Sequence, residues 1–162
     1  MEHSKLNWLR AGVLGANDGI ISVAVLLVTL VGIVDVQHLV IVGVSTILGG
    51  AISMALGEYV SVAAQRDAEK QAESLNLTNP WHAAFSSFSA FAIGALFPFF
   101  FAVFTQNIVA VISSVYLALI VTTIVSVKVG KVKLSRPLIR NFVGGTIALG
   151  LGIILNIVLS GS

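Results

Sequence analysis

Residues 39–63 read LVIVGVSTILGGAISMALGEYVSVA, and Glu58 is the only charged side chain in this run. An α-helix needs about 20 apolar residues to cross a bilayer, so the run is long enough for one span. Because unpaired backbone groups cannot face lipid, apolar runs of this length must be helical. Four further runs of the same character lie at 9–34, 82–104, 108–127 and 141–159. The sequence therefore predicts an all-α integral membrane protein, with residues 1–162 forming a single domain of five transmembrane helices.

The composition agrees with this interpretation. Of the 162 residues, 57% are hydrophobic and 10% are charged, and the mean hydropathy is +1.01. Soluble domains carry about 25% charged residues, so a soluble enzyme is excluded. The absence of cysteine excludes disulfides and thiolate chemistry. No nucleophile–base pair or cofactor motif is present either, so we expect neither enzymatic activity nor a bound cofactor.

The positive charges predict the orientation of the five helices. All nine fall on one side of this topology: Lys5, Arg10, Arg66, Lys70, Lys128, Lys131, Lys133, Arg136 and Arg140. Short cytoplasmic segments are rich in Lys and Arg, so we expect the N-terminus in the cytoplasm and the C-terminus outside. The pI near 9.2 then reflects topology, and the expected surroundings are a lipid bilayer and no nucleic acid.

Two carboxylates fall inside predicted spans, Asp18 and Glu58. A carboxylate within a transmembrane helix costs about 2.5–3.5 kcal/mol on insertion scales, so it should face protein or a wet cavity. We expect no lysine or arginine of these spans to neutralise either acid. Each would then bind a proton or an external cation.

Helix geometry brings a methionine to the same level. At about 1.5 Å per residue, Asp18 and Met54 each lie roughly 14 Å inside the cytoplasmic end of their helices, with Glu58 one turn nearer the cytoplasm. Small residues share the carboxylate face of each helix, so we expect the first and second helices to pack closely through them and to bring these three side chains together. The glycines expected to serve in this way are Gly15, Gly19, Gly50 and Gly57.

Two carboxylates and a thioether form an informative set of ligands. Carboxylates alone suit Mg²⁺ or Ca²⁺, whereas thioether sulfur favours softer transition metals. The mixture therefore indicates a borderline divalent ion such as Fe²⁺ or Mn²⁺, and the protonatable carboxylates would couple its movement to protons. Structural alternatives stay open, because Met54 could serve only in packing and Glu58 could reach the interface.

Other polar residues are weaker candidates. Those along the expected path are Asn17, Ser22 and Thr46. Asn17 points away from the Asp18 face of a regular helix and is better suited to an interhelical hydrogen bond. A cytoplasmic mouth could include Asp67, Glu69 and Glu73, although Arg66 and Lys70 beside them favour a solvated face.

Two long motifs resemble a known family. Residues 9–19 (LRAGVLGANDG) are similar to the first-helix signature of the vacuolar iron transporter family, which includes the nodulin-like membrane proteins. Residues 49–62 (GGAISMALGEYVSV) resemble its second-helix signature, followed by Gln65-Arg66-Asp67. The stretch 90–98 of the third helix is also similar.

The resemblance implies a homodimer of five-helix protomers that exchanges cytosolic Fe²⁺ or Mn²⁺ for protons. It also implies that the first helices line the metal path at the dimer interface. The family's aspartate and methionine map onto Asp18 and Met54, and Glu58 matches the nodulin-like branch. Two departures concern the plant vacuolar branch. Thr46 stands where that branch has a glutamate, and the connection 64–81 is too short for its cytoplasmic metal-binding domain.

The sequence therefore predicts a transporter that exports divalent metal from the cytosol, with Asp18, Met54 and Glu58 as ligands. A plasma or inner membrane is expected, or a vacuolar membrane in a eukaryote. Two rival functions remain. One is a non-transporting membrane scaffold, and the other is an organic-cation carrier in which the two acids serve as counter-charges.

Overall fold

The protein folds as five long helices in a computed structural model that describes residues 2–73, 77–130 and 135–161. The helices are α1 (Glu2–Leu30), α2 (Val36–Gln71), α3 (Pro80–Thr105), α4 (Ile108–Gly130) and α5 (Ser135–Ser160). All five are long and apolar enough to cross a membrane, and the described residues contain no strand. The prediction of an all-α membrane protein with five spans is confirmed.

The helix bounds differ from the hydropathy prediction: α1 ends at Leu30 rather than at 34, α5 begins at Ser135 rather than at 141, and α3 and α4 run up to three residues further at an end. The first helix begins at Glu2 rather than at residue 9, and α2 continues to Gln71 rather than ending at 63. The added part of α2 is rich in Ala, Gln, Arg, Glu and Lys, which are strong helix formers. Hydropathy therefore marks the end of the apolar run, whereas α2 continues beyond that point because the residues that follow favour the helix.

Side-chain caps define where α2 and α3 begin. The Asp35 carboxylate accepts a hydrogen bond from the backbone N–H of His38 at 2.9 Å, and this bond lowers the pKa of Asp35 below its usual value. The Asn79 side chain accepts hydrogen bonds from two backbone N–H groups at the start of α3, with Pro80 in the first turn. Both residues satisfy backbone donors that the helix leaves unpaired.

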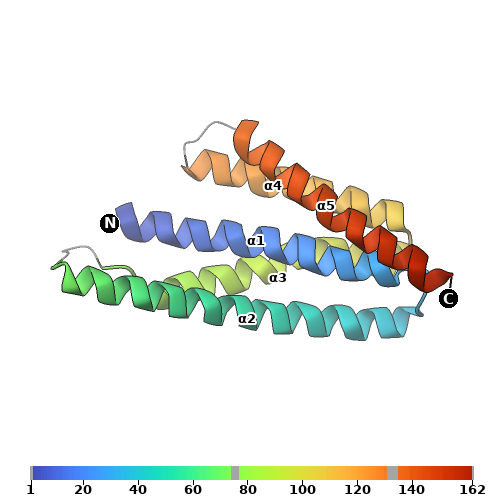
Figure 1. The fold of residues 1–162 in the computed structure, drawn as a ribbon, viewed down its shortest axis with the longest axis horizontal. Helices are drawn as coiled ribbons and strands as arrows, with labels where there is room; N and C mark the ends of the chain where they lie inside the picture. Colours follow the sequence, from blue (N-terminus) through green and yellow to red (C-terminus); the bar gives the residue numbers. More distant parts are fainter. Residues whose placement is uncertain (1, 74–76, 131–134, 162) are drawn as a thin grey trace.

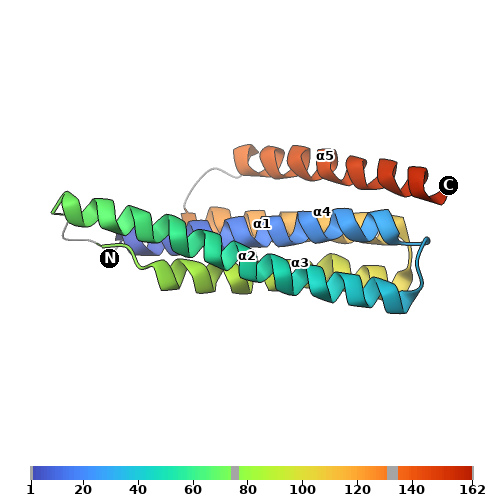
Figure 2. The same cartoon turned by 60° about the horizontal axis from the view of Figure 1, so that its bottom comes forward.

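The first helix is the centre of the bundle. It contacts all four other helices, whereas α2 contacts neither α4 nor α5. Figure 1 shows α1 between the α2–α3 pair and the α4–α5 pair, and in Figure 2 α1 overlaps α4, with α5 on one side and α2 and α3 on the other. Half of the α1 span is buried inside the protein, a larger share than for any other span. The second helix therefore has one face that none of the described residues covers.

Glycines bring α1 and α3 into backbone contact. A Cβ atom added at Gly15 or Gly19 would collide with the backbone oxygen of Ser87 or Phe91 on α3. A Cβ at Gly94 of α3 would lie 2.7 Å from the backbone oxygen of Ala16. The two helices therefore approach as closely as small residues allow.

The expectation that the α1 glycines pack on α2 is wrong. They pack on α3, because α3 presents its own small residues to α1, as Ser87 and Gly94 do. On α2, Gly50 lies against the ring of Phe91, and a Cβ at Gly57 would meet nothing within 4 Å. Near Gly57, α2 therefore does not pack closely on α1, although the two helices contact each other elsewhere.

The described basic residues lie toward one end of the bundle, which we call the basic end. In Figure 1 the start of α1, the ends of α2 and α4 and the starts of α3 and α5 lie at this end, and the α1–α2 turn, the α3–α4 turn and the end of α5 lie at the other. The basic residues concerned in the helices are Arg10, Arg66, Lys70, Lys128 and Arg140. Lys131 and Lys133 lie outside the described residues. The placement of this end in the cytoplasm stays a prediction.

We expect Gly94→Ala to destabilise the bundle. The added methyl group must push α1 away, and overpacking of this kind costs about 1–3 kcal/mol. Thermal unfolding of the protein in lipid nanodiscs, followed by tryptophan fluorescence, would measure the loss. Gly150→Ala is the matched control, because a Cβ there meets nothing within 4 Å. Equal unfolding temperatures for the two variants would contradict the backbone contact.

Candidate metal site

A polar cavity of about 510 Å³ lies between α1 and α2. Asp18 and Ser22 line it from α1, and Phe91 lines it from α3. The remaining lining residues are Leu14, Thr46, Gly50, Ser53, Met54, Gly57 and Glu58. The structure thus places the three predicted ligands, Asp18, Met54 and Glu58, around one space.

Asp18 supplies the cavity with an uncompensated negative charge. Its side chain is exposed on the surface of the single chain, within the span Asn7–Leu30. The structure gives its carboxylate no hydrogen bond and no ion pair with any of the residues that it describes. A bare carboxylate at this depth is costly unless a cation, a proton or another chain meets it.

Met54 and the hydroxyl groups of Ser22 and Thr46 are neutral groups in the cavity wall. Met54 is half-buried against the hydrophobic core. Ser22 donates its hydroxyl proton to the backbone oxygen of Asp18, and Thr46 donates to the backbone oxygen of Val42 at 2.8 Å. Since a hydroxyl oxygen keeps its lone pairs after donating, both groups can still accept or coordinate from the cavity wall.

Phe91 gives the cavity an apolar floor. Its side chain is 2% exposed, and its ring lies against Gly50, which has no side chain to keep it away. An aromatic wall offers no competing charge and lowers the local dielectric constant, which strengthens the attraction between a carboxylate and a cation. Sequence analysis did not identify this residue, because a phenylalanine in a Phe-rich helix carries no distinguishing signal.

The expectation that Glu58 lacks a basic partner is wrong. Arg10 Nη2 lies 2.9 Å from Glu58 Oε2, and the Glu58 side chain is 6% exposed. Arg10 belongs to α1, and its long side chain crosses to α2 at this point. The two intramembrane acids are therefore not equivalent, since Glu58 is paired and Asp18 is not.

The ligand set of one chain is small. Within the described part of the chain, no three His, Cys, Asp or Glu side chains cluster as a metal site. Asp18 offers an anionic oxygen, Met54 a soft sulfur and Glu58 a carboxylate already engaged through Oε2. Such a mixed set suits a borderline divalent ion whose remaining positions are filled by water or by another chain.

Asn17 lies away from this cavity. Its amide donates to Asn141 Oδ1 at 3.4 Å and accepts from the Thr122 hydroxyl at 3.4 Å. Asn141 in turn donates to the Thr123 hydroxyl at 3.0 Å. Asn17 therefore ties α1 to α4 and α5, as the interhelical interpretation predicted, and is not part of the cavity wall.

The acids of the expected cytoplasmic mouth lie beyond the cavity. Asp67 pairs with Lys70 at 3.6 Å, and Glu73 follows the end of α2 with a φ of 54°. Glu69 accepts hydrogen bonds from the backbone N–H and the hydroxyl of Thr78, at 2.7 and 3.0 Å. Because Thr78 is 2% exposed, Glu69 anchors the segment that leads into α3, a role that sequence analysis missed.

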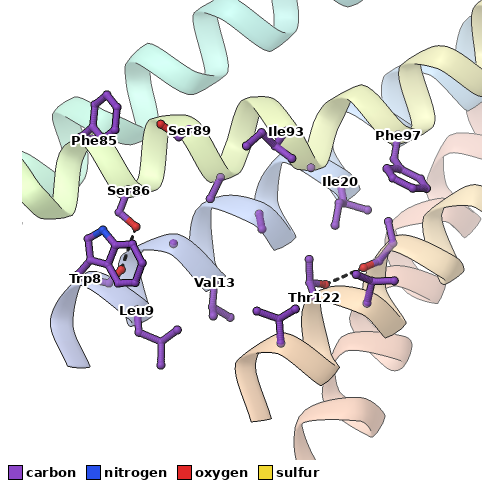
Figure 3. A pocket seen from close by; sticks show the side chains of 17 residues that line it. Trp8, Leu9, Val13, Ile20, Phe85, Ser86, Ser89, Ile93, Phe97 and Thr122 are labelled. Carbon is purple, nitrogen blue, oxygen red and sulfur yellow. Dashed lines mark hydrogen bonds between the residues drawn. The ribbon is translucent and has the colours of Figure 1, made fainter. Parts of the chain in front are cut away.

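A second cavity, of about 480 Å³, lies between α1, α3 and α4 (Figure 3). Apolar side chains dominate its wall, including Val13, Ile20, Ile93 and Phe97. Its polar lining is limited to hydroxyl and indole groups, and the Ser86 hydroxyl donates to the backbone oxygen of Trp8 at 3.0 Å. Without a carboxylate it cannot replace the water around a metal ion, so the α1–α2 cavity is the candidate metal site.

Comparison with known proteins gives a consistent result. The VIT family matches residues 9–76 and 70–156 of this chain. The chain is 34% identical to "Vacuolar iron transporter homolog 2.1" of Arabidopsis thaliana, over 91% of this chain and 79% of that protein. It is 38% identical to "Vacuolar iron transporter homolog 5" of Oryza sativa subsp. japonica, over 91% of this chain and 78% of that protein.

A third relative, "VIT-like transporter 1b" of Glycine max, is 33% identical over 91% of this chain and 74% of its own length. No solved structure matches the chain. The arrangement of the five helices and the cavity therefore rests on the structure described above.

Proposed function

The chain belongs to the VIT family, and from that premise we propose that it carries Fe²⁺ or Mn²⁺ across the membrane through the Asp18–Met54 cavity. The observation that carries this proposal is the unpaired Asp18 carboxylate inside a transmembrane span. Relatives are named as iron transporter homologs, which supports iron as the cargo. The thioether of Met54 supports a transition metal over Mg²⁺ or Ca²⁺.

Each residue has a distinct part in this mechanism. Asp18 provides the charge that attracts the ion, and Met54 on the opposite helix provides a soft ligand that discriminates between ions. Phe91 excludes water from one side of the ion. The Asp18 and Glu58 carboxylates can each take a proton when the metal leaves, which supports exchange of metal for protons.

The direction and location follow from the charge distribution. The basic end should face the cytoplasm by the positive-inside rule, and Glu58 lies on that side of Met54. Metal would then enter past Glu58 and leave toward the opposite end, out of the cytosol. The protein is a multi-pass membrane protein, for which we propose the plasma or inner membrane, or the vacuolar membrane in a eukaryotic cell.

A second copy of the chain would complete the site. Asp18, Ser22 and Ser53 are exposed in the single chain, although they lie within membrane spans. Polar groups at this depth should face protein or water rather than lipid. An isologous dimer through the α1–α2 face would cover these side chains and bring two cavities together. This supports a homodimer whose metal path runs along its interface.

We expect Asp18→Ala to reduce metal flux to the level of protein-free liposomes, because the substitution removes the charge that offsets dehydration of the ion. Influx of Fe²⁺ and Mn²⁺ into proteoliposomes, with a pH dye inside, would measure metal and proton movement together. Asp35→Asn is the control, since it removes a carboxylate outside the spans and keeps a good N-cap residue.

Full metal flux through well-folded Asp18→Ala would contradict the transport proposal. Flux without proton movement would retain the transporter and remove the exchange. If bulky organic cations compete with the metal, the organic-cation carrier is favoured. If no flux is measured, the scaffold is favoured.

We expect Leu14→Cys to form cross-linked dimers in the membrane. Leu14 is 46% exposed and lines the polar cavity. In the proposed dimer, residue 14 of one protomer should therefore lie close to residue 14 of its partner. The chain has no native cysteine to interfere, and a membrane-permeant bis-maleimide followed by electrophoresis would report the product.

Ile93→Cys is the matched control for the cross-link, because Ile93 is 67% exposed but lines the apolar cavity. Dimers formed through Ile93→Cys and not through Leu14→Cys would contradict the proposed α1–α2 interface and place it on the side of the apolar cavity.

A further inference from the structure

The Arg10–Glu58 ion pair stands at the end of the polar cavity nearer the basic end. Glu58 follows Met54 by one helical turn, and Arg10 precedes Asp18 by roughly 12 Å of helix at 1.5 Å per residue. The pair joins α1 to α2 with 2.9 Å between Arg10 Nη2 and Glu58 Oε2. An ion that moves from the basic end toward Asp18 meets this pair first.

The two partners differ in exposure. The Glu58 side chain is 6% exposed, whereas the Arg10 side chain is 52% exposed. Glu58 lines the cavity, and Arg10 does not. The carboxylate is therefore fixed within the protein, while the guanidinium approaches it from the surface.

The ion pair also changes the charge of the cavity. Asp18 and Glu58 together would present two negative charges, enough to balance a divalent ion. Arg10 cancels one of them, so the resting cavity carries a single uncompensated charge. Only Oε2 of Glu58 is engaged, and Oε1 has no hydrogen bond with the residues that the structure describes.

Arg10 is held only loosely beside the ion pair. Its Nε donates to the Asn7 side chain on the same helix at 3.3 Å while Nη2 contacts Glu58. Because the Arg10 side chain is 52% exposed, it has room to rotate away from Glu58 without moving a helix. The attraction of Glu58 for a divalent ion is twice that for a monovalent ion at equal distance, so a divalent ion competes better with the guanidinium.

We propose that Arg10 is a displaceable internal cation that occupies Glu58 until a divalent metal replaces it. This inference rests on the proposed transport function and adds a residue that controls access to the site. Arg10 would keep the cavity closed to monovalent cations and lower its affinity for metal, which would favour release.

The test is equilibrium binding of Mn²⁺ to the full chain in lipid nanodiscs, measured by the electron paramagnetic resonance signal of free Mn²⁺. We expect Arg10→Gln to lower the Kd about fivefold, which corresponds to the ~1 kcal/mol of a half-exposed ion pair. Glu58→Gln should raise the Kd. In the Glu58→Gln background, Arg10→Gln should not change the Kd further, because Arg10 no longer has a carboxylate to neutralise.

Lys70→Gln is the matched control. It removes one positive charge from the same end of the protein, but Lys70 pairs with Asp67 and not with Glu58. An equal gain in affinity for Lys70→Gln would mean that surface charge alone is responsible and would overturn the proposal. If Arg10→Gln fails to fold, Arg10→Lys replaces it. Its Kd is expected to lie below the wild-type Kd by less than the fivefold change expected for Arg10→Gln.

Unchanged or weaker Mn²⁺ binding by folded Arg10→Gln, or by Arg10→Lys when it is the variant used, overturns the role of Arg10. Asp18→Ala separates this result from failure of the transport function. If Asp18→Ala abolishes binding and the Arg10 variant has the wild-type Kd, only the Arg10 proposal fails. Binding that ignores Asp18 overturns the proposed metal site, and no binding by any variant overturns both.

Discussion

The backbone contact between α1 and α3 is the constraint on which the remaining structure depends. Gly15 and Gly19 press α1 onto backbone atoms of α3, and this contact sets the rotation of α1 about its own axis. Asn17 is thereby directed to α4 and α5, and Asp18 faces the cavity shared with α2. Three consecutive residues, Asn17 to Gly19, therefore face the four other helices between them. A substitution that alters this contact would displace the Asp18 carboxylate although it replaces none of the candidate ligands.

Several polar groups within the spans have hydrogen-bond partners, although the buried Ser87 hydroxyl has none among the described residues. Asn156 of α5 donates to the backbone oxygens of Thr29 and Val31, both at 3.0 Å, where α1 ends. The Asn17 network and the Ser86 hydrogen bond serve the same purpose on other faces of α1. Such bonds are expected where no water is available to satisfy polar atoms. The Asp18 carboxylate is a charged group without such a partner among the described residues, and a site that departs from local satisfaction is where function is expected.

Much of this organisation could be predicted from the sequence. Hydropathy identified five spans, and helix rise placed Asp18, Met54 and Glu58 around one space, because both signals depend on a single regular helix. The partner of the α1 glycines was not predictable, since small residues on α2 and α3 look alike until the packing is known. The Arg10–Glu58 pair was missed because the reach of a long side chain between helices leaves no periodic signal. Glu69 was read as solvated for a similar reason, as its partner Thr78 lies in a connection.

The central claim is that Asp18 and Met54 bind the same metal ion. X-ray absorption at the iron edge of Fe²⁺-loaded protein in nanodiscs tests it directly, because sulfur and oxygen neighbours scatter differently. We expect a sulfur atom among the atoms bound to the iron in the wild type and its loss in Met54→Leu, with the oxygen ligands retained. A shell of oxygen atoms alone in the wild type would contradict the claim and leave Met54 a role in packing.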